Sequence, residues 1–186
     1  LLVRDLEKKF TINEIANTLN EYYSFVHRIV NRLIIDRVII KEKVGKSYIC
    51  SLNIDNEKTI ALVQLSEIEK KEEFYTANKE LKIILEDFIK ALESKLAIIS
   101  IVLFGSYAKR NAKKESDIDV MIVVKEKIQI DKIIKEIYAK YGKEINTIMI
   151  TSKDFKKQKN KPIIKEIINN HYIIYSADKF VSLMLK

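Results

Sequence analysis

Two apolar runs of strand length, on either side of a polar segment, constrain the fold of this chain more than any other part of its sequence. The first runs from Ile98 to Phe104 and leads directly into Gly105-Ser106. The second begins at Asp117 and continues to Val124. Runs of this length that are bounded by glycine or polar residues are typical of strands buried in a sheet. We therefore expect a sheet here, with a polar connection at one of its edges.

Two carboxylates stand at the start of the second run. Because side chains alternate along a strand, Asp117 and Asp119 share one face and lie roughly 7 Å apart. Like charges at that distance repel each other, and a divalent cation such as Mg²⁺, which prefers oxygen ligands, relieves the repulsion. Gly105 permits a close backbone approach, while Ser106 and neighbouring N–H groups can bind phosphate oxygens. The pattern predicts a site for a metal ion and a phosphate.

The segment FGSYAKRNAKKESDIDVMIVV, residues 104–124, resembles the nucleotidyltransferase signature of the DNA polymerase beta superfamily. That signature is Gly-Ser, ten intervening residues and Asp-x-Asp, and residues 107–116 form a spacer of ten. The resemblance covers roughly residues 95–186, and the short length is similar to the minimal, prokaryotic branch. A chance match on a generic α/β domain is the alternative.

The resemblance implies a mixed sheet flanked by helices, with the active site at its open edge. It implies two-metal transfer of a nucleoside monophosphate from an NTP to a hydroxyl group, with Mg²⁺ as the metal and ATP as the expected donor. Asp117 and Asp119 would bind the metals, and Gly105 and Ser106 would hold the triphosphate. Further basic residues, which could neutralise developing phosphate charge, are Lys109 and Arg110. For Lys113 and Lys114 we favour a simpler interpretation, an exposed basic loop.

Two departures from the family pattern bear on activity. Many relatives have a glycine-containing turn where this chain has Lys109-Arg110-Asn111. The family also has a third carboxylate on a later strand, which here corresponds to residues 144–150. Glu144 is the only acid on that strand and is our candidate for the third catalytic carboxylate. Asn146 shares its face and could occupy the slot instead, in which case catalysis would be weak or lost.

The N-terminal part predicts three short helices and a hairpin. Thr11 and Glu14 form a capping box, which starts a helix after a first amphipathic helix over residues 1–10. A further helix carries Val26 and Val30 at helical spacing, and a hairpin follows, with its turn around Gly45. This order resembles the winged helix-turn-helix domains of prokaryotic regulators.

If this segment binds DNA, the candidate contacts are polar residues on one helix face and lysines of the hairpin. They are His27, Arg28, Asn31, Arg32, Lys43 and Lys46. Winged helices also serve as dimerisation or protein-docking modules, and polar residues on a helix are often only solvated. Both interpretations stay open.

Charge separates the regions. The total is +8, from 34 basic and 26 acidic residues, and residues 101–186 alone hold 18 basic and 10 acidic ones. An excess confined to one region indicates an anion-binding face rather than a general nucleic-acid coat. We expect an α+β protein with a winged helix domain (1–55), a helical connector (56–95) and a nucleotidyltransferase domain (96–186). Dimerisation through the connector is left open.

No apolar run approaches the roughly 18 residues of a membrane span, and one cysteine excludes an internal disulfide. We therefore expect a cytoplasmic protein without membrane contact. The leading function is nucleotidyl transfer, with a toxin of the HEPN ribonuclease class as a candidate protein acceptor and an antitoxin role. The alternatives are a DNA-binding regulator whose transferase-like domain only senses nucleotide, and a structural adaptor.

Overall fold

The computed structural model describes residue 2, residues 8–45 and residues 47–185. The chain divides into two compact units, Leu1–Val63 and Gln64–Lys186. The division falls inside the long helix α3 (Glu57–Ala77), so part of the predicted connector belongs to each unit. The units are described separately below.

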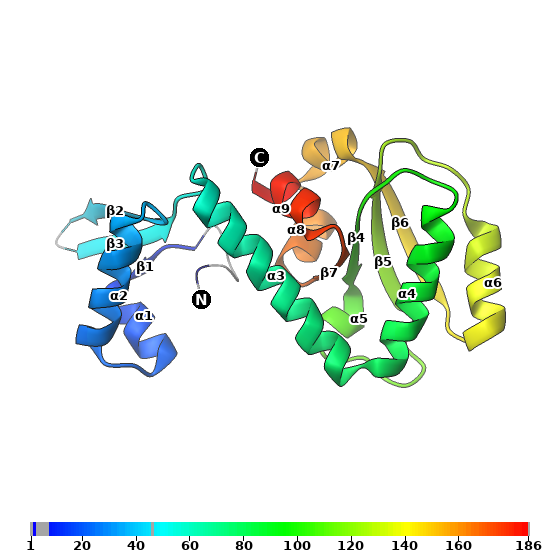
Figure 1. Cartoon of the computed structure of the whole chain (residues 1–186), viewed down its shortest axis with the longest axis horizontal. Helices are drawn as coiled ribbons and strands as arrows, with labels where there is room; N and C mark the ends of the chain where they lie inside the picture. Colours follow the sequence, from blue (N-terminus) through cyan, green and yellow to red (C-terminus); the bar gives the residue numbers. More distant parts are fainter. Residues whose placement is uncertain (1, 3–7, 46, 186) are drawn as a thin grey trace. The chain divides into compact units, whose positions relative to one another are not determined.

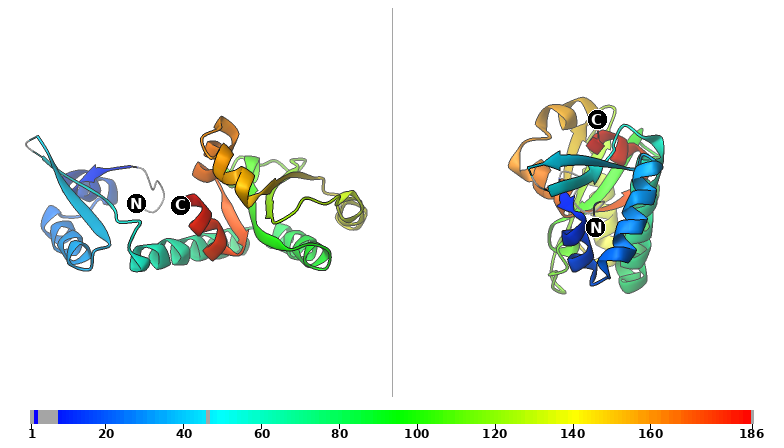
Figure 2. Two further views of the ribbon diagram at one scale, coloured as in Figure 1. Left: turned by 90° about the horizontal axis from the view of Figure 1, so that it is seen from above. Right: turned by 90° about the vertical axis from the view of Figure 1, so that its left-hand side faces the viewer.

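The N-terminal unit combines two helices with a small sheet. Strand β1 (Phe10–Thr11) leads into α1 (Ile12–Leu19) and α2 (Tyr23–Ile35), and the hairpin β2 (Ile39–Val44) and β3 (Ser47–Leu52) follows (Figures 1 and 2). The sheet order is β1-β3-β2, and both pairings are antiparallel. The unit therefore contains the two successive helices and the hairpin that the sequence predicts.

Local sequence explains how α1 begins. The Thr11 hydroxyl accepts a hydrogen bond from the Glu14 backbone N–H at 3.2 Å, and Glu14 Oε2 accepts from the Thr11 N–H at 2.7 Å. The predicted capping box is thus confirmed. The helix predicted over residues 1–10 falls mainly outside the described residues, and its last residue is corrected: Phe10 lies in a strand and pairs with Cys50.

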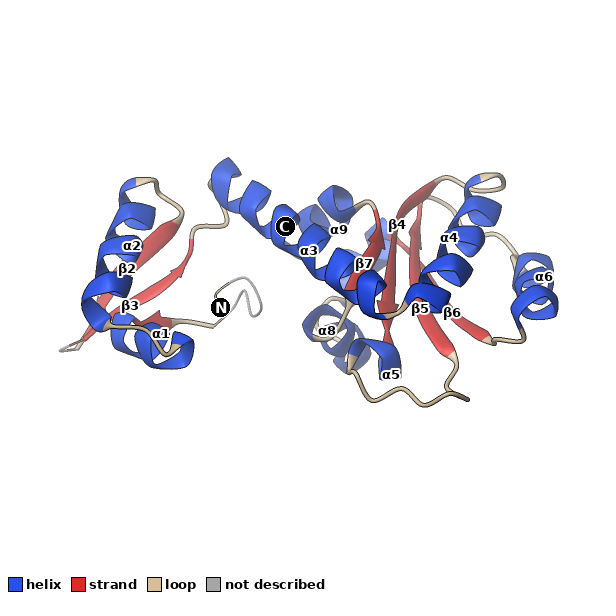
Figure 3. Ribbon diagram, turned by 60° about the horizontal axis from the view of Figure 1, so that its bottom comes forward, coloured by secondary structure: helices blue, strands red, loops and turns tan. Residues whose placement is uncertain are grey.

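The C-terminal unit is built on a four-stranded sheet of order β6-β5-β4-β7 (Figure 3). The strands are β4 (Ile98–Phe104), β5 (Ile118–Val124), β6 (Ile145–Thr151) and β7 (Tyr172–Tyr175). β5 and β6 are parallel, whereas β4 is antiparallel to both β5 and β7. The predicted mixed sheet and its two apolar strands are confirmed.

Helices cover both faces of this sheet (Figures 1 and 3). α4 (Lys79–Glu93) and α6 (Asp131–Tyr141) lie on one face, and the other carries α7 (Ser152–Gln158), α8 (Pro162–Asn169) and α9 (Ala177–Leu185). Ile118, Val120, Ile122 and Val124 of β5 are fully buried in one cluster with residues of α4 and α6. Because side chains alternate, Asp119 lies on the opposite face.

Candidate active site

The predicted Gly-Ser turn directly follows β4 and opens the short helix α5 (Gly105–Ala108). Gly105 has φ +69°, a conformation that side-chain-bearing residues rarely adopt. A Cβ at this position would lie 2.1 Å from Asp119 Oδ2, which is far inside van der Waals contact. Only glycine fits here, because the carboxylate of Asp119 packs directly against the turn.

The sheet register brings two carboxylates and one amide together. Phe104 on β4 pairs with Asp119 on β5, and Asp119 pairs with Asn146 on the parallel strand β6. Asn146 Nδ2 lies 3.4 Å from Asp117 Oδ2 and 3.4 Å from Asp119 Oδ1. These are long, weak hydrogen bonds. An amide nitrogen therefore bridges the two carboxylates whose mutual repulsion the sequence indicated.

The structure corrects the prediction that Glu144 supplies a third carboxylate to this pair. Glu144 precedes β6, and its backbone carbonyl accepts a hydrogen bond from the Ile118 N–H at 2.9 Å. Its side chain is exposed, and no group of three or more His, Cys, Asp or Glu residues able to hold a metal occurs among the described residues. Of the two residues that the sequence left as alternatives, Asn146 is the one that contacts both aspartates.

The two basic candidates next to the turn have partners from late in the chain. Lys109 forms an ion pair with Glu166 of α8, and both side chains are exposed. Arg110 Nε donates to the hydroxyl of Tyr172 at 3.1 Å, and this hydrogen bond raises the pKa of Arg110 above its ordinary value. Arg110 adopts a left-handed conformation, with φ +59°. Neither partner was expected from the sequence.

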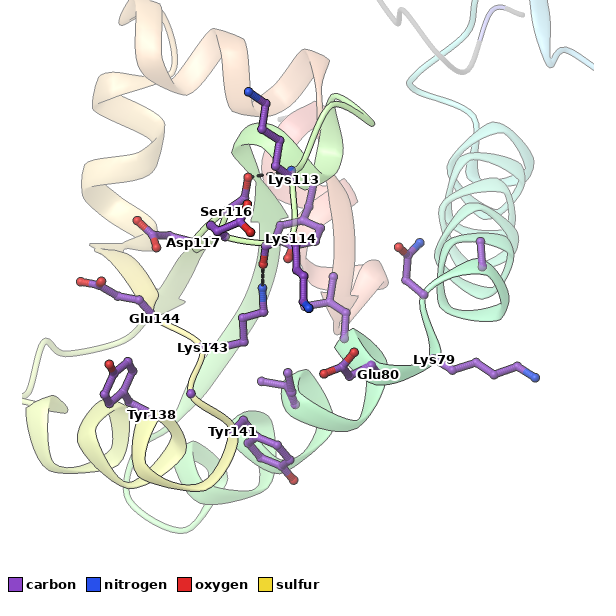
Figure 4. Close-up of a pocket in the computed structure, with 17 residues that line it drawn as sticks. Lys79, Glu80, Lys113, Lys114, Ser116, Asp117, Tyr138, Tyr141, Lys143 and Glu144 are labelled. Atoms are coloured by element: carbon purple, nitrogen blue, oxygen red, sulfur yellow. Dashed lines mark hydrogen bonds between the residues drawn. The ribbon is translucent and has the colours of Figure 1, made fainter.

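A pocket of about 880 Å³ lies beside Asp117 (Figure 4). Its wall includes Lys113 and Lys114, which are exposed as predicted, and Glu144. It also has residues that the sequence analysis did not single out, namely Lys79, Glu80, Tyr138, Tyr141 and Lys143. Lys143 Nζ donates to the backbone carbonyl of Lys114, which joins two loops of the wall. Four lysines and four acidic residues line the pocket, so its wall is charged but balanced.

Several of these pocket residues would have been predictable if the strand pairing had been known. β5 and β6 are parallel and joined through α6, so the segments that enter both strands lie at the same edge of the sheet. Residues 142–144 enter β6 and residues 113–117 enter β5, which places the two segments side by side. The missing signal was the parallel pairing itself, which is a long-range property.

The N-terminal candidates are mostly engaged within their own helix. The His27 ring stacks on Tyr23, with 5.6 Å between ring centroids, and His27 Nδ1 lies 3.2 Å from Asn31 Nδ2. Arg32 Nε lies 3.5 Å from Asp36 Oδ2. Arg28 and Lys43 are exposed, and Lys46 lies outside the described residues. These residues share a unit, but nothing in their contacts selects a ligand.

One further finding concerns membranes. Among the helices that the structure describes, none is both long enough and apolar enough to cross a bilayer.

Comparison with known proteins identifies one family and several relatives that share a name. A family model described as "Polymerase beta, Nucleotidyltransferase" matches residues 86–180. Three proteins of Methanocaldococcus jannaschii, each named a "putative protein adenylyltransferase", are 34%, 33% and 36% identical to this chain over 112, 96 and 95 residues. These alignments cover 55%, 49% and 50% of this chain, and 76%, 94% and 93% of the relatives.

A solved structure described as a toxin-antitoxin with AMP-PNP covers 54% of this chain and 82% of its own, at 15% identity and a TM-score of 0.39. That similarity is too low to carry an argument about function. The family match is different, because it spans half of the chain and includes Gly105, Asp117, Asp119 and Asn146. The chain therefore belongs to the polymerase beta nucleotidyltransferase family.

Proposed function

We propose that this chain transfers AMP from ATP to a hydroxyl group of a protein. The observation that carries the proposal is the contact between Gly105 and the carboxylate of Asp119, which joins the phosphate-binding turn to the aspartate pair. The names of the three relatives support adenylyl transfer and a protein acceptor. A toxin of the HEPN class is a candidate acceptor on the family resemblance alone.

The reaction joins the acceptor oxygen to the α-phosphorus of ATP and breaks the bond between the α-phosphorus and the bridging oxygen. Pyrophosphate leaves with that bond pair, and the hydroxyl proton passes to solvent. In this proposal Gly105 and Ser106 hold phosphate oxygens, and Lys109 and Arg110, which follow α5 in the chain, supply positive charge. Balancing the charge that develops on the phosphate lowers the barrier.

The donor set suits a hard divalent cation. Two carboxylates and a carboxamide, whose oxygen can replace its nitrogen by a rotation of the side chain, are ligands of the type that Mg²⁺ accepts. Asp117, Asp119 and Asn146 would hold the ion. When bound, Mg²⁺ polarises the phosphate and neutralises its charge.

The test is transfer of labelled AMP from ATP to protein acceptors in the presence of Mg²⁺. The Asp117→Asn/Asp119→Asn variant keeps the shape of both side chains and removes their charge, so we expect at least a 100-fold lower rate, the scale of such electrostatic contributions. Asp131→Asn, an exposed position in α6, is the matched control and should retain activity. Undiminished transfer by the double variant would overturn the proposal.

A second candidate function is a DNA-binding regulator whose transferase-like unit senses nucleotide. Asn146 favours it, because an amide replaces the carboxylate that the family uses to activate the acceptor. In this proposal the N-terminal helices and hairpin act as a winged helix, with the exposed residues Arg28, Arg32 and Lys43 on DNA. DNA affinity that changes with ATP, without turnover, would support it, and Arg28→Ala/Arg32→Ala should weaken binding and reduce its salt dependence.

A further inference from the structure

We infer that the aspartate site holds one divalent cation rather than two, and that Asn146 sets this number. The inference rests on the proposed function, because it concerns the site that would bind ATP. It departs from the two-ion arrangement that the family resemblance implies.

The first step is the position of Asn146. It pairs with Asp119 in the parallel register, and its amide is 3.4 Å from an oxygen of each aspartate. A residue at this position faces both carboxylates, so a carboxylate here would complete a cluster of three. The amide instead contributes a neutral group.

The second step is the charge available to metal ions. Two divalent ions in a shared site lie roughly 3.5–4 Å apart, and their repulsion is about four times that of two unit charges at the same distance. Three carboxylates balance three of the four positive charges, whereas Asp117 and Asp119 balance only two. The phosphates of ATP add negative charge in both cases. The two cases therefore differ only in the number of negative charges that the protein supplies.

The third step is whether another acid can take the place of the missing carboxylate. Among the described residues no third acidic, His or Cys side chain joins the pair. Glu144 lines the pocket outside the pair, and Glu166 is engaged by Lys109. The Asn146 amide adds a neutral oxygen ligand, which supports one ion with the two aspartates.

The Asn146 amide also explains how the carboxylates of Asp117 and Asp119 can lie close together when no cation is bound. Asn146 Nδ2 donates to both carboxylates and so reduces their repulsion. A third carboxylate could not donate. We therefore expect Asn146→Asp to be less stable than the wild type in EDTA and to gain more in melting temperature when Mn²⁺ is added.

The experiment counts Mn²⁺ ions on the full chain saturated with a non-hydrolysable ATP analogue. Equilibrium dialysis gives the number per chain, and electron paramagnetic resonance distinguishes an isolated ion from a spin-coupled pair. We expect one uncoupled Mn²⁺ for the wild type and two coupled ions for Asn146→Asp. Asn160→Asp adds the same charge at an exposed position and should remain at one.

The outcomes separate the inference from the function on which it rests. Two ions on the wild type, or one on a folded Asn146→Asp, would overturn the inference and leave the proposed function standing. Equal Mn²⁺ binding by the wild type and Asp117→Asn/Asp119→Asn would contradict the proposed site itself. The wild-type count needs no variant, so it tests the number of ions even if Asn146→Asp does not fold.

Discussion

Gly105 is the residue at which the two halves of the sequence signature meet in space. A glycine before a serine indicates a close backbone approach, but the sequence does not say what approaches. The structure identifies the partner as Asp119, which is 14 positions later and belongs to the adjacent strand. Because Asp119 must lie against Gly105, the contact constrains the length of the segment between the turn and the aspartates.

Gly105→Ala tests that contact against backbone strain alone. Gly142 has φ +63°, and a methyl group placed on it would meet no atom within 4 Å, so Gly142→Ala should cost roughly 1–3 kcal/mol from strain. Gly105→Ala carries the same strain and the clash with Asp119, so we expect a larger loss of unfolding free energy and loss of AMP transfer. Urea denaturation of both variants measures the difference, and equal losses would contradict the role of Asp119.

Asn146 shows where residue-level reasoning stops. Alternation places Glu144 and Asn146 on one face of a strand, but it does not say where the strand begins or how it is paired. Both follow from the parallel register with β5, in which Asn146 lies opposite Asp119. The aspartate pair was predictable because its two members are two positions apart in the sequence, Asp117 just before β5 and Asp119 within it, whereas the third position depends on pairing between distant segments.

At the level of elements, β7 and α3 contact the segment after the Gly-Ser turn through Tyr172. This side chain is buried, its ring stacks on Phe74 of α3 at 4.1 Å between centroids, and its hydroxyl accepts a hydrogen bond from Arg110. Arg110 lies two residues after the end of α5. A strand near the end of the chain therefore orients a basic residue of the site.

Tyr172→Phe removes that hydrogen bond and keeps the ring stack. We expect a several-fold higher KM for ATP, little change in kcat, and a melting temperature close to that of the wild type, since one hydrogen bond contributes about 1 kcal/mol. Tyr75→Phe is the matched control, because the buried Tyr75 hydroxyl has no hydrogen-bond partner among the described residues. An unchanged KM in Tyr172→Phe would show that Tyr172 does not orient Arg110.

A buried contact between a glutamate and a histidine joins the same two regions. Glu67 of α3 and His171, which precedes β7, are both almost fully buried, with Glu67 Oε2 3.4 Å from His171 Nε2 and 3.3 Å from Lys70 Nζ. Burial raises the pKa of Glu67, but His171 and Lys70 together outweigh it and lower the pKa below its ordinary value. His171 Nδ1 in turn donates to the carbonyl of Ile168.

A lowered pKa in the folded state means that ionised Glu67 stabilises the fold above the ordinary pKa of about 4.5, and that this stability is lost as the pH falls through the lowered value. Glu67→Gln should therefore reduce the unfolding free energy at pH 7 by roughly 3 kcal/mol and flatten its decline in acid. Chemical denaturation from pH 7 to 3 measures both. Glu69→Gln, exposed on the same helix, should keep the wild-type profile.

For the whole molecule, the positive charge is distributed differently from what composition indicates. Residues 101–186 carry the excess, yet the pocket beside Asp117 has balanced walls. Much of the excess lies instead on exposed lysines around α7 and α8, namely Lys153, Lys156, Lys157, Lys161 and Lys165. The excess of positive charge in this region could thus be predicted from the sequence. The position of these charges on the surface depends on the packing of the last helices.

The division into two units also makes a prediction about stability. Each unit has its own buried cluster: Ile12, Ile15 and Val26 belong to one, and Leu85 and Phe88 to the other. Ile15→Ala and Leu85→Ala each remove a buried side chain and should each cost roughly 2–5 kcal/mol. Since the clusters are separate, we expect each variant to destabilise its own unit.

Hydrogen exchange followed by mass spectrometry tests this on the full chain, because local opening reports the stability of each segment. Ile15→Ala should accelerate exchange in β2 and β3 and leave β4 and β5 unchanged, whereas Leu85→Ala should do the reverse. Helix α3 contributes residues to both units, so its first turns should follow Ile15→Ala and its last turns Leu85→Ala. Uniform acceleration along the chain in either variant would mean that the two units unfold as one. A substitution in the N-terminal unit would then affect the aspartate site only by lowering the stability of the whole chain.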